Sequence, residues 1–210
     1  MALKELWWKN KSKKFQNGYM RLFISIEPDP EVRDLIIRSQ RQLSLYCGTE
    51  GFKYIIPENI HLTLNFLGEL APHRVNDIIE ILVDEAENCS SGRYKVIRSG
   101  SFDNKGLPAV IWAGLDDIDH CIVPIQRKIT QKLQKMNLPY EKRKFVPHFT
   151  ICYVKNPPLH CRSALLQIIP TLITESNQVE GKAKVLSLKE SILKPDGAVY
   201  RSLFDVDLQA

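Results

Sequence analysis

The chain of 210 residues is long enough for one large domain or two small interlocked lobes, and its 44% hydrophobic and 25% charged residues are ordinary for a globular protein. Its net charge of +5 is compatible with an anionic substrate such as RNA, although many equally basic proteins bind no nucleic acid. The sequence has no apolar run of about 18 residues and opens with no signal-peptide pattern, so we expect neither a membrane-spanning helix nor export.

The five cysteines are odd in number and form no Cys-x-x-Cys pair. This usage favours reduced thiols over disulfides or a zinc site, and it predicts a cytoplasmic location. The cysteines are Cys47, Cys89, Cys121, Cys152 and Cys161.

Residues 1–19 carry two tryptophans, Trp7 and Trp8, and a lysine-rich stretch without clear periodicity. We expect this basic and aromatic segment to be an N-terminal extension, docked by its tryptophans on a single domain formed by residues 20–210. A flexible leader, an unprocessed start upstream of Met20 and a patch that contacts nucleic acid remain alternatives.

The domain begins with a predicted strand at residues 21–26 (RLFISI). Residues 27–30 predict a turn in which Asp29 caps a helix and Pro30 fits the first helical position. Apolar residues at helical spacing continue to Leu45, and a glycine-containing turn then ends the helix.

A short predicted strand at residues 53–56 leads into a longer strand at 59–68 (NIHLTLNFLG). The apolar stripe at residues 72–87 predicts a second helix, and residues 94–100 predict another strand. We interpret residues 101–108, which contain Asp, Asn, Gly and Pro, as a turn-rich connector.

The pattern of the first half then returns. Residues 109–114 predict a strand, aspartates that can cap a helix follow, and apolar residues from Ile122 to Leu133 keep helical spacing. The basic segment 142–144 leads to a strand that opens at His148.

The spacing within the two halves is nearly the same. His61 follows Arg21 by 40 residues, and His148 follows Val110 by 38. We interpret this agreement as an internal duplication, which by symmetry would bring the two histidine-containing strands together across a central cleft.

The C-terminal part predicts a helix at residues 163–169 and a strand at 178–183. Alternating runs at 186–191 and 198–206 flank Pro-Asp-Gly at 195–197, which is a hairpin signal. Hairpins and short strands favour antiparallel sheets with one polar face, so the predicted class is α+β.

The most informative feature is a His-x-Thr pair that occurs twice, as His61 with Thr63 and as His148 with Thr150. In a strand, side chains at i and i+2 lie on one face about 6.6 Å apart, so each histidine shares a face with its threonine. A single copy is usually only the polar face of an amphipathic strand. Two copies in matching contexts favour a function, in which two imidazoles and two hydroxyls bind an anion and transfer protons around it.

At these residues the sequence resembles the two-histidine phosphoesterase superfamily, specifically the LigT-like RNA 2′,3′-cyclic phosphodiesterases. The resemblance covers most of the chain from Met20. Its landmarks are residues 21–24 (RLFI), 57–64 (PENIHLTL), 66–68 (FLG), 111–114 (IWAG), 147–150 (PHFT), Glu190, Ser191 and Tyr200.

The resemblance implies a duplicated bilobal α+β fold in which two antiparallel sheets face a central cleft with helices outside. It implies that His61 is the proton donor to the leaving ribose O3′ and that His148 is the proton acceptor that activates water, giving a 2′-phosphate. Imidazole titrates near neutrality and can take either role, and the hydroxyls of Thr63 and Thr150 can donate to the phosphate oxygens.

One departure from the family pattern affects substrate binding. Many relatives have an arginine five residues after the second histidine, where this chain has Tyr153. The missing charge would have to come from Arg143, Lys144 or Lys155. By strand alternation Tyr153 has the opposite parity to His148, so a β-bulge or strand end must intervene if it is to face substrate.

No carboxylate cluster or His/Cys set with metal-ligand spacing lies beside the motifs, so we expect no metal or other cofactor. His73, His120 and His160 fall on or near predicted helices or loops and are expected on the surface. The expected partners are RNA ends or cyclic nucleotides, and no obligatory protein partner is evident.

Two alternatives remain open at this point. One is a 2′,5′-phosphodiesterase or 2′-5′ RNA ligase that uses the same histidine pair. The other is a non-catalytic RNA-binding or nucleotide-binding module, against which the intact histidines and threonines of both motifs count.

Overall fold

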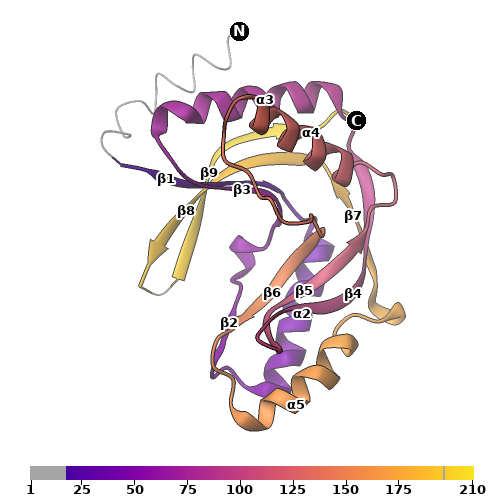
Figure 1. Cartoon of the computed structure of the whole chain (residues 1–210). Coiled ribbons are helices and arrows are strands. Elements are labelled where there is room, and N and C mark those ends of the chain that lie inside the picture. Colours follow the sequence, from indigo (N-terminus) through magenta and orange to yellow (C-terminus); the bar gives the residue numbers. More distant parts are fainter. Residues whose placement is uncertain (1–17, 196) are drawn as a thin grey trace.

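The computed structural model describes residues 18–195 and 197–210 and has the predicted α+β class (Figure 1). In this part of the chain nine strands form one curled sheet, in which all neighbouring strands are antiparallel. The strands are β1 (Met20–Ile26), β2 (Phe52–Tyr54), β3 (Leu62–Leu70), β4 (Gly92–Asn104), β5 (Leu107–Asp116), β6 (His148–Val154), β7 (Val179–Ala183), β8 (Val185–Lys194) and β9 (Gly197–Asp207).

The strand order is β7-β4-β5-β6-β3-β1-β8-β9, with β2 paired to β6. The two histidine-containing strands, β3 and β6, are therefore central. They are joined by a single residue pair, Leu62 with Phe149, and each belongs to one lobe of the curled sheet (Figure 1). The order reads as four strands on each side of this junction, which is what a duplicated unit would produce. The duplication itself stays a prediction.

Four longer helices cover the outer faces of the lobes: α2 (Pro30–Cys47), α3 (Val75–Asn88), α4 (Ile122–Lys135) and α5 (Leu159–Ile168). Helices α3 and α4 pack together against the lobe that contains β3, β8 and β9. Helices α2 and α5 pack together against the other lobe, where α2 contacts β6 and β7. Each half of the chain thus contributes one helix to the lobe of the other half, so the lobes are interlocked.

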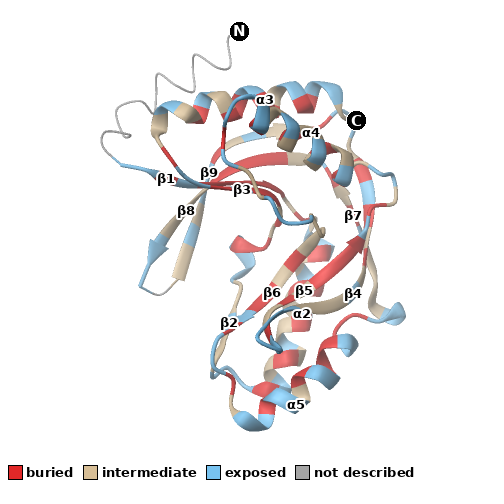
Figure 2. Ribbon diagram, in the orientation of Figure 1, coloured by how far each residue is buried: buried red, intermediate tan, exposed pale blue. Residues whose placement is uncertain are grey.

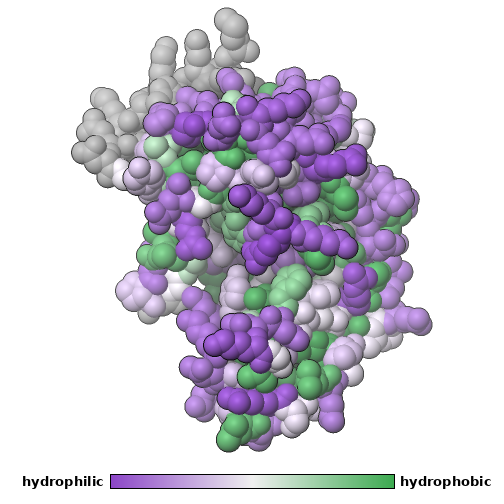
Figure 3. All heavy atoms as spheres, in the orientation of Figure 1, coloured by the Kyte–Doolittle hydropathy of each residue, from purple (hydrophilic) through white to green (hydrophobic). Residues whose placement is uncertain are grey.

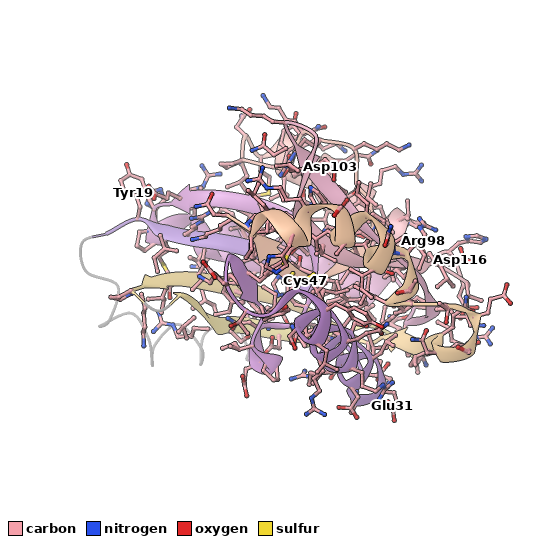
Figure 4. The ribbon with its side chains drawn as sticks, turned by 90° about the horizontal axis from the view of Figure 1, so that it is seen from below. Tyr19, Glu31, Cys47, Arg98, Asp103 and Asp116 are labelled. Carbon is pink, nitrogen blue, oxygen red and sulfur yellow. The ribbon has the colours of Figure 1, made fainter. Side chains whose placement is uncertain are left out.

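The core is built from the apolar stripes of these helices and the outer faces of the strands (Figure 2). In α2, Val32, Leu35, Ile36 and Leu43 are fully buried, as their helical spacing predicts. Viewed from below, Glu31 of α2 and Asp103 of the β4–β5 hairpin lie on opposite sides of the molecule, so the hairpin tip is remote from the α2 layer (Figure 4).

Two aspartates expected as helix caps have different roles. Asp117 is not the N-cap residue of α4, which is Cys121, but its carboxylate accepts hydrogen bonds from the backbone N–H groups of Cys121 and Val123 at 3.0 and 2.9 Å and so stabilises the start of the helix. Asp29 precedes α2 but makes no side-chain cap. Its carboxylate instead accepts from the Lys182 backbone N–H and from Lys184 Nζ, which ties the start of α2 to β7.

The prediction of a turn-rich connector at residues 101–108 is wrong in its extent. Strands β4 and β5 continue to Asn104 and from Leu107, leaving a two-residue turn. Lys105 and Gly106 both have positive φ, 52° and 78°, as in the tight turns that match strand twist. The residue pattern identified a turn but not its length, because Lys105 is not a usual residue for that conformation.

The other boundaries differ by a few residues. Helix α5 begins at Leu159, earlier than the predicted 163, directly after Pro158. The predicted hairpin is confirmed by the pairing of β8 with β9, and Asp196 of its turn lies outside the described residues, as do residues 1–17 of the expected extension. Among the helices that the structure describes, none has the length and hydropathy needed to cross a membrane.

Candidate active site

A cavity of about 790 Å³ lies between the lobes, and all four residues of the two His-x-Thr pairs line it. They meet there because β3 and β6 are neighbours at the junction of the lobes. In the space-filling view, hydrophilic side chains project over the middle of this face, where the chain runs from α4 to β6 (Figure 3).

His61 lies immediately before β3 and is held by two hydrogen bonds. Its Nδ1 is 2.7 Å from the backbone carbonyl oxygen of Asn59, and its Nε2 is 2.9 Å from Thr63 Oγ1. Because a carbonyl only accepts, Nδ1 must carry the hydrogen. In the neutral imidazole, Nε2 then accepts the hydroxyl hydrogen of Thr63.

His148, the first residue of β6, has the same anchor. Its Nδ1 donates to the backbone carbonyl oxygen of Val146 at 2.6 Å, again two residues upstream. Both imidazoles therefore have the same tautomer when neutral, with Nε2 as the basic nitrogen. A group that can accept or release a proton at a fixed position is what general acid–base catalysis requires.

Aromatic rings surround both histidines, and none of them was predicted as a site residue. Phe23 and Tyr200 lie beside His61, with ring centroids at 4.8 and 5.2 Å. Phe102 and Trp112 lie beside His148, at 5.0 and 6.3 Å. Trp112 and Tyr200 appeared only as landmarks of the family resemblance. Phe23 belongs to the landmark residues 21–24 as well, and its strand parity was a further signal.

Two glycines make room for the Trp112 ring. A Cβ atom at Gly100 would come within 2.5 Å of the indole, and one at Gly114 within 2.7 Å. Gly100 pairs with Trp112 across β4 and β5, and Gly114 pairs with His148 across β5 and β6. The glycines thus let the indole lie flat on the sheet next to His148.

Burial lowers the pKa of both histidines. The pKa of His61 falls to about 4, because burial is reinforced by the positive charges of Lys189 and His148, although the hydrogen bond to Asn59 opposes the change. Burial also lowers the pKa of His148, opposed by the hydrogen bond to Val146. In the free protein both imidazoles are therefore neutral at pH 7.

Lys189 is a buried cation on β8, with its side chain only 9% exposed. Its Nζ lies 2.8 Å from Glu27 Oε1. It pairs across the sheet with Phe23, whose ring contacts His61. Lys189 thus places a positive charge near His61. The sequence pattern did not predict that Lys189 belongs to the site.

Tyr153 also lines the cavity, and a β-bulge explains its orientation. Cys152 pairs with Ile111, and the next pair along joins Thr150 to Trp112, so Ile151 is the extra residue. The irregularity resets the alternation and places Tyr153 on the side of His148 and Thr150. The expectation that a bulge must intervene is confirmed.

Three basic residues could supply the charge of the missing family arginine. Two of them, Arg143 and Lys144, line the cavity, whereas Lys155 does not. The guanidinium of Arg143 is bound by the Glu141 carboxylate at 3.0 and 2.6 Å, so its charge is already compensated. The three remaining histidines are exposed, as expected: His73, His120 and His160.

Within residues 18–195 and 197–210 no group of three or more His, Cys, Asp and Glu side chains could hold a metal ion. All five cysteines lie in this range and are free thiols. The side chains that line the cavity include two imidazoles, two threonine hydroxyls, two phenols, the hydroxyl of Ser191, the carboxylate of Glu141 and three basic groups.

A family model described as LigT-like phosphoesterase matches residues 26–112 and 116–200. Each of these segments contains one His-x-Thr pair. The chain is 30% identical over 186 residues to an RNA 2′,3′-cyclic phosphodiesterase of Archaeoglobus fulgidus, covering 88% of this chain and 98% of that protein. It is 28% identical to a protein of the same name from Thermotoga maritima, covering 90% and 96%.

Solved structures agree with the fold. A structure from Thermus thermophilus matches with a TM-score of 0.75 at 24% identity, covering 90% of this chain and 98% of that one. Escherichia coli LigT in complex with 3′-AMP matches with a TM-score of 0.69 at 17% identity, covering 92% and 100%. At these identities the likeness concerns the fold alone.

Proposed function

Because the chain belongs to the LigT-like phosphoesterase family, we propose that it is an RNA 2′,3′-cyclic phosphodiesterase that hydrolyses cyclic phosphate ends to 2′-phosphates. The observation that carries the proposal is the pair of imidazoles in one cavity, each anchored through Nδ1 to a carbonyl two residues upstream. The curated relatives of near-equal length carry the name of this activity.

In the proposed reaction, water attacks the phosphorus atom while the bond from phosphorus to O3′ breaks. His148 Nε2 takes the proton of the attacking water, and protonated His61 Nε2 gives a proton to the departing O3′. The phosphate remains on O2′. The assignment of the two roles rests on the family resemblance, and the need for one acid and one base follows from the chemistry.

The hydrogen bond between His61 and Thr63 gives the threonine a second function. In the free protein the hydroxyl of Thr63 donates to the neutral imidazole. Once His61 is protonated, Nε2 no longer accepts, so the hydroxyl hydrogen of Thr63 is free to reach a phosphate oxygen while Nε2–H is available to O3′. Thr63 and Thr150 would then stabilise negative charge that develops on the phosphate.

The anionic substrate assists this protonation. The positive charge of Lys189 disfavours protonated His61 in the free protein, whereas a bound cyclic phosphate places a negative charge beside the imidazole. Substrate binding therefore raises the pKa of His61 and prepares the acid only when there is a leaving group to protonate.

A panel of three substrates separates the proposed function from its alternatives. Hydrolysis of adenosine 2′,3′-cyclic phosphate supports the proposal. Faster cleavage of a 2′,5′-linked dinucleotide, or joining of RNA ends, would make one of the related activities the main one. Tight binding of all three substrates without conversion would identify a binding module.

We expect a metal-independent reaction, because the two imidazoles supply both proton-transfer groups. Activity should be unchanged after dialysis against a chelator such as EDTA and after readdition of Mg²⁺ or Zn²⁺. Activity that disappears with the chelator and returns with a divalent ion would contradict the proposal.

Binding of single-stranded RNA should weaken as salt rises, by about 0.7 in the logarithmic slope for each phosphate neutralised. A mononucleotide should show a shallower dependence. Lys144→Gln should reduce the slope for RNA, and Lys155→Gln, outside the cavity, is the matched control. Equal salt-dependence slopes for RNA and mononucleotide would mean that the basic residues are only exposed to solvent and do not contact RNA phosphates.

The proposal also covers the organisation and location of the chain. We assign residues 20–210 to a single bilobal domain with an internal duplication and residues 1–19 to an extension. A cytoplasmic location fits the five free thiols. The proposed partners are RNA ends and cyclic nucleotides.

A further inference from the structure

Arg21 lies in the same cavity as the histidines, although no motif identified it as a site residue. It precedes Phe23 by two positions on β1, and both residues line the cavity. The Phe23 ring contacts His61 at 4.8 Å. At about 3.3 Å per strand residue, the Cα atom of Arg21 lies roughly 6.6 Å from that of Phe23 along β1. Arg21 is exposed whereas His61 is half-buried, which places Arg21 towards solvent from the histidine.

Arg21 forms no ion pair with any of the described residues, although Glu69 lies opposite it on β3. The cations that line the cavity are Arg21, Arg143 and Lys144, and the only lining carboxylate among the described residues is Glu141. Arg143 takes that carboxylate in a two-point ion pair. None of the ion pairs in the described part of the chain includes Arg21.

The positive charge of Arg21 affects the pKa values of two phenols that line the same cavity. Burial raises the pKa of Tyr153, and that of Tyr200 to about 12, and in both cases the positive charge of Arg21 opposes the change. Tyr153 comes from β6 and Tyr200 from β9, so three donor side chains from three strands line the same cavity. Tyr200 also packs edge-on against His61, with ring centroids 5.2 Å apart.

A planar guanidinium in one cavity with two phenol hydroxyls is suited to a phosphate, which can accept two parallel hydrogen bonds from an arginine. The phosphate that reacts already has the two imidazoles and the two threonine hydroxyls around it. An RNA strand that leaves the cavity carries its next phosphate past exposed residues of the lining, and Arg21 is one of them.

We propose that Arg21, together with Tyr153 and Tyr200, binds the phosphodiester that precedes the cyclic phosphate in an RNA strand. The proposal rests on the proposed function and deepens it, because it makes RNA 3′ ends the preferred substrate over free cyclic mononucleotides.

The test compares three substrates: a cyclic mononucleotide, a dinucleotide with a terminal cyclic phosphate, and the same dinucleotide with an uncharged methylphosphonate linkage. One charge-assisted contact predicts that the dinucleotide exceeds the methylphosphonate in kcat/KM by about 10-fold to 100-fold. In Arg21→Gln this ratio should fall close to 1. Arg162→Gln, an exposed arginine on α5 outside the cavity, is the matched control and should keep the ratio.

Equal losses by Arg21→Gln on all three substrates would mean that Arg21 binds the reacting phosphate, and unchanged rates on all three would mean that it binds none. Both outcomes overturn the proposed subsite. Calorimetric titration of wild type and Arg21→Gln with the charged and uncharged dinucleotides separates the two proposals. No hydrolysis by wild type overturns the proposed function alone, whereas equal affinity of wild type for both dinucleotides overturns the subsite.

Discussion

Replacement of His61 or His148 by alanine is expected to lower kcat/KM for adenosine 2′,3′-cyclic phosphate by about 10²-fold to 10⁴-fold, the usual contribution of a positioned acid or base. Each substitution removes a Nε2 that the backbone anchor holds in the cavity. Steady-state kinetics of the two variants measure the effect. Because the histidines act on one transition state, the double variant should lose less than the product of the two single losses.

Three further variants make this result specific. Thr63→Ala and Thr150→Ala should each have a smaller effect, because each removes one hydrogen bond to the phosphate. His73→Ala is the matched control, since His73 is an exposed histidine outside the cavity. A histidine variant of the cavity that retains wild-type rates would contradict the mechanism.

The second large effect concerns pH. One imidazole must be protonated and the other neutral, so kcat/KM should be bell-shaped, with limbs set by the pKa values of the free protein. Both values lie below the ordinary 6.5, and that of His61 is about 4. The maximum should therefore lie on the acid side of 6.5. Above the higher pKa the acid is lost, and kcat/KM falls about tenfold per pH unit.

Lys189 offers a direct test of the cause of this profile. Its positive charge lowers the pKa of His61, so removing it should raise that pKa and move the acid limb of the profile to higher pH. Lys189→Met combined with Glu27→Gln avoids a half-buried carboxylate without its partner. Lys184→Met, which breaks a different ion pair on an adjacent part of the chain, should leave the profile unchanged. A kcat/KM profile of the wild type that is flat between pH 5 and 9 would contradict the account. So would an acid limb that lies at the same pH in the Lys189→Met/Glu27→Gln variant and in Lys184→Met.

Local patterns were sufficient to predict the class of the fold and the strands that carry the histidines. Alternation around His61 and His148 identified β3 and β6, and Pro-Asp-Gly identified the β8–β9 hairpin. The parity of Tyr153 required a bulge, which the structure places at Ile151. These features depend on spacing over a few residues, where side-chain direction follows directly from backbone geometry.

The rest of the site depends on contacts between distant segments. The aromatic rings beside His148 come from β4 and β5, and the indole of Trp112 needs the space left by Gly100 and Gly114. Arg21 belongs to the landmark residues 21–24, but the sequence did not assign it a role, because the described part of the structure is needed to see that it lines the cavity without an ion-pair partner there. The turn at Lys105 was misjudged because a lysine rarely has positive φ.

The most direct test of the central claim is the identity of the product formed from adenosine 2′,3′-cyclic phosphate. Chromatography against authentic standards, or ³¹P NMR, distinguishes adenosine 2′-phosphate from adenosine 3′-phosphate. The mechanism predicts the 2′-phosphate from the wild-type protein and almost none of either product from His61→Ala or His148→Ala. Formation of the 3′-phosphate would reverse the leaving-group assignment, and an unreacted cyclic phosphate with the wild-type protein would contradict the function itself.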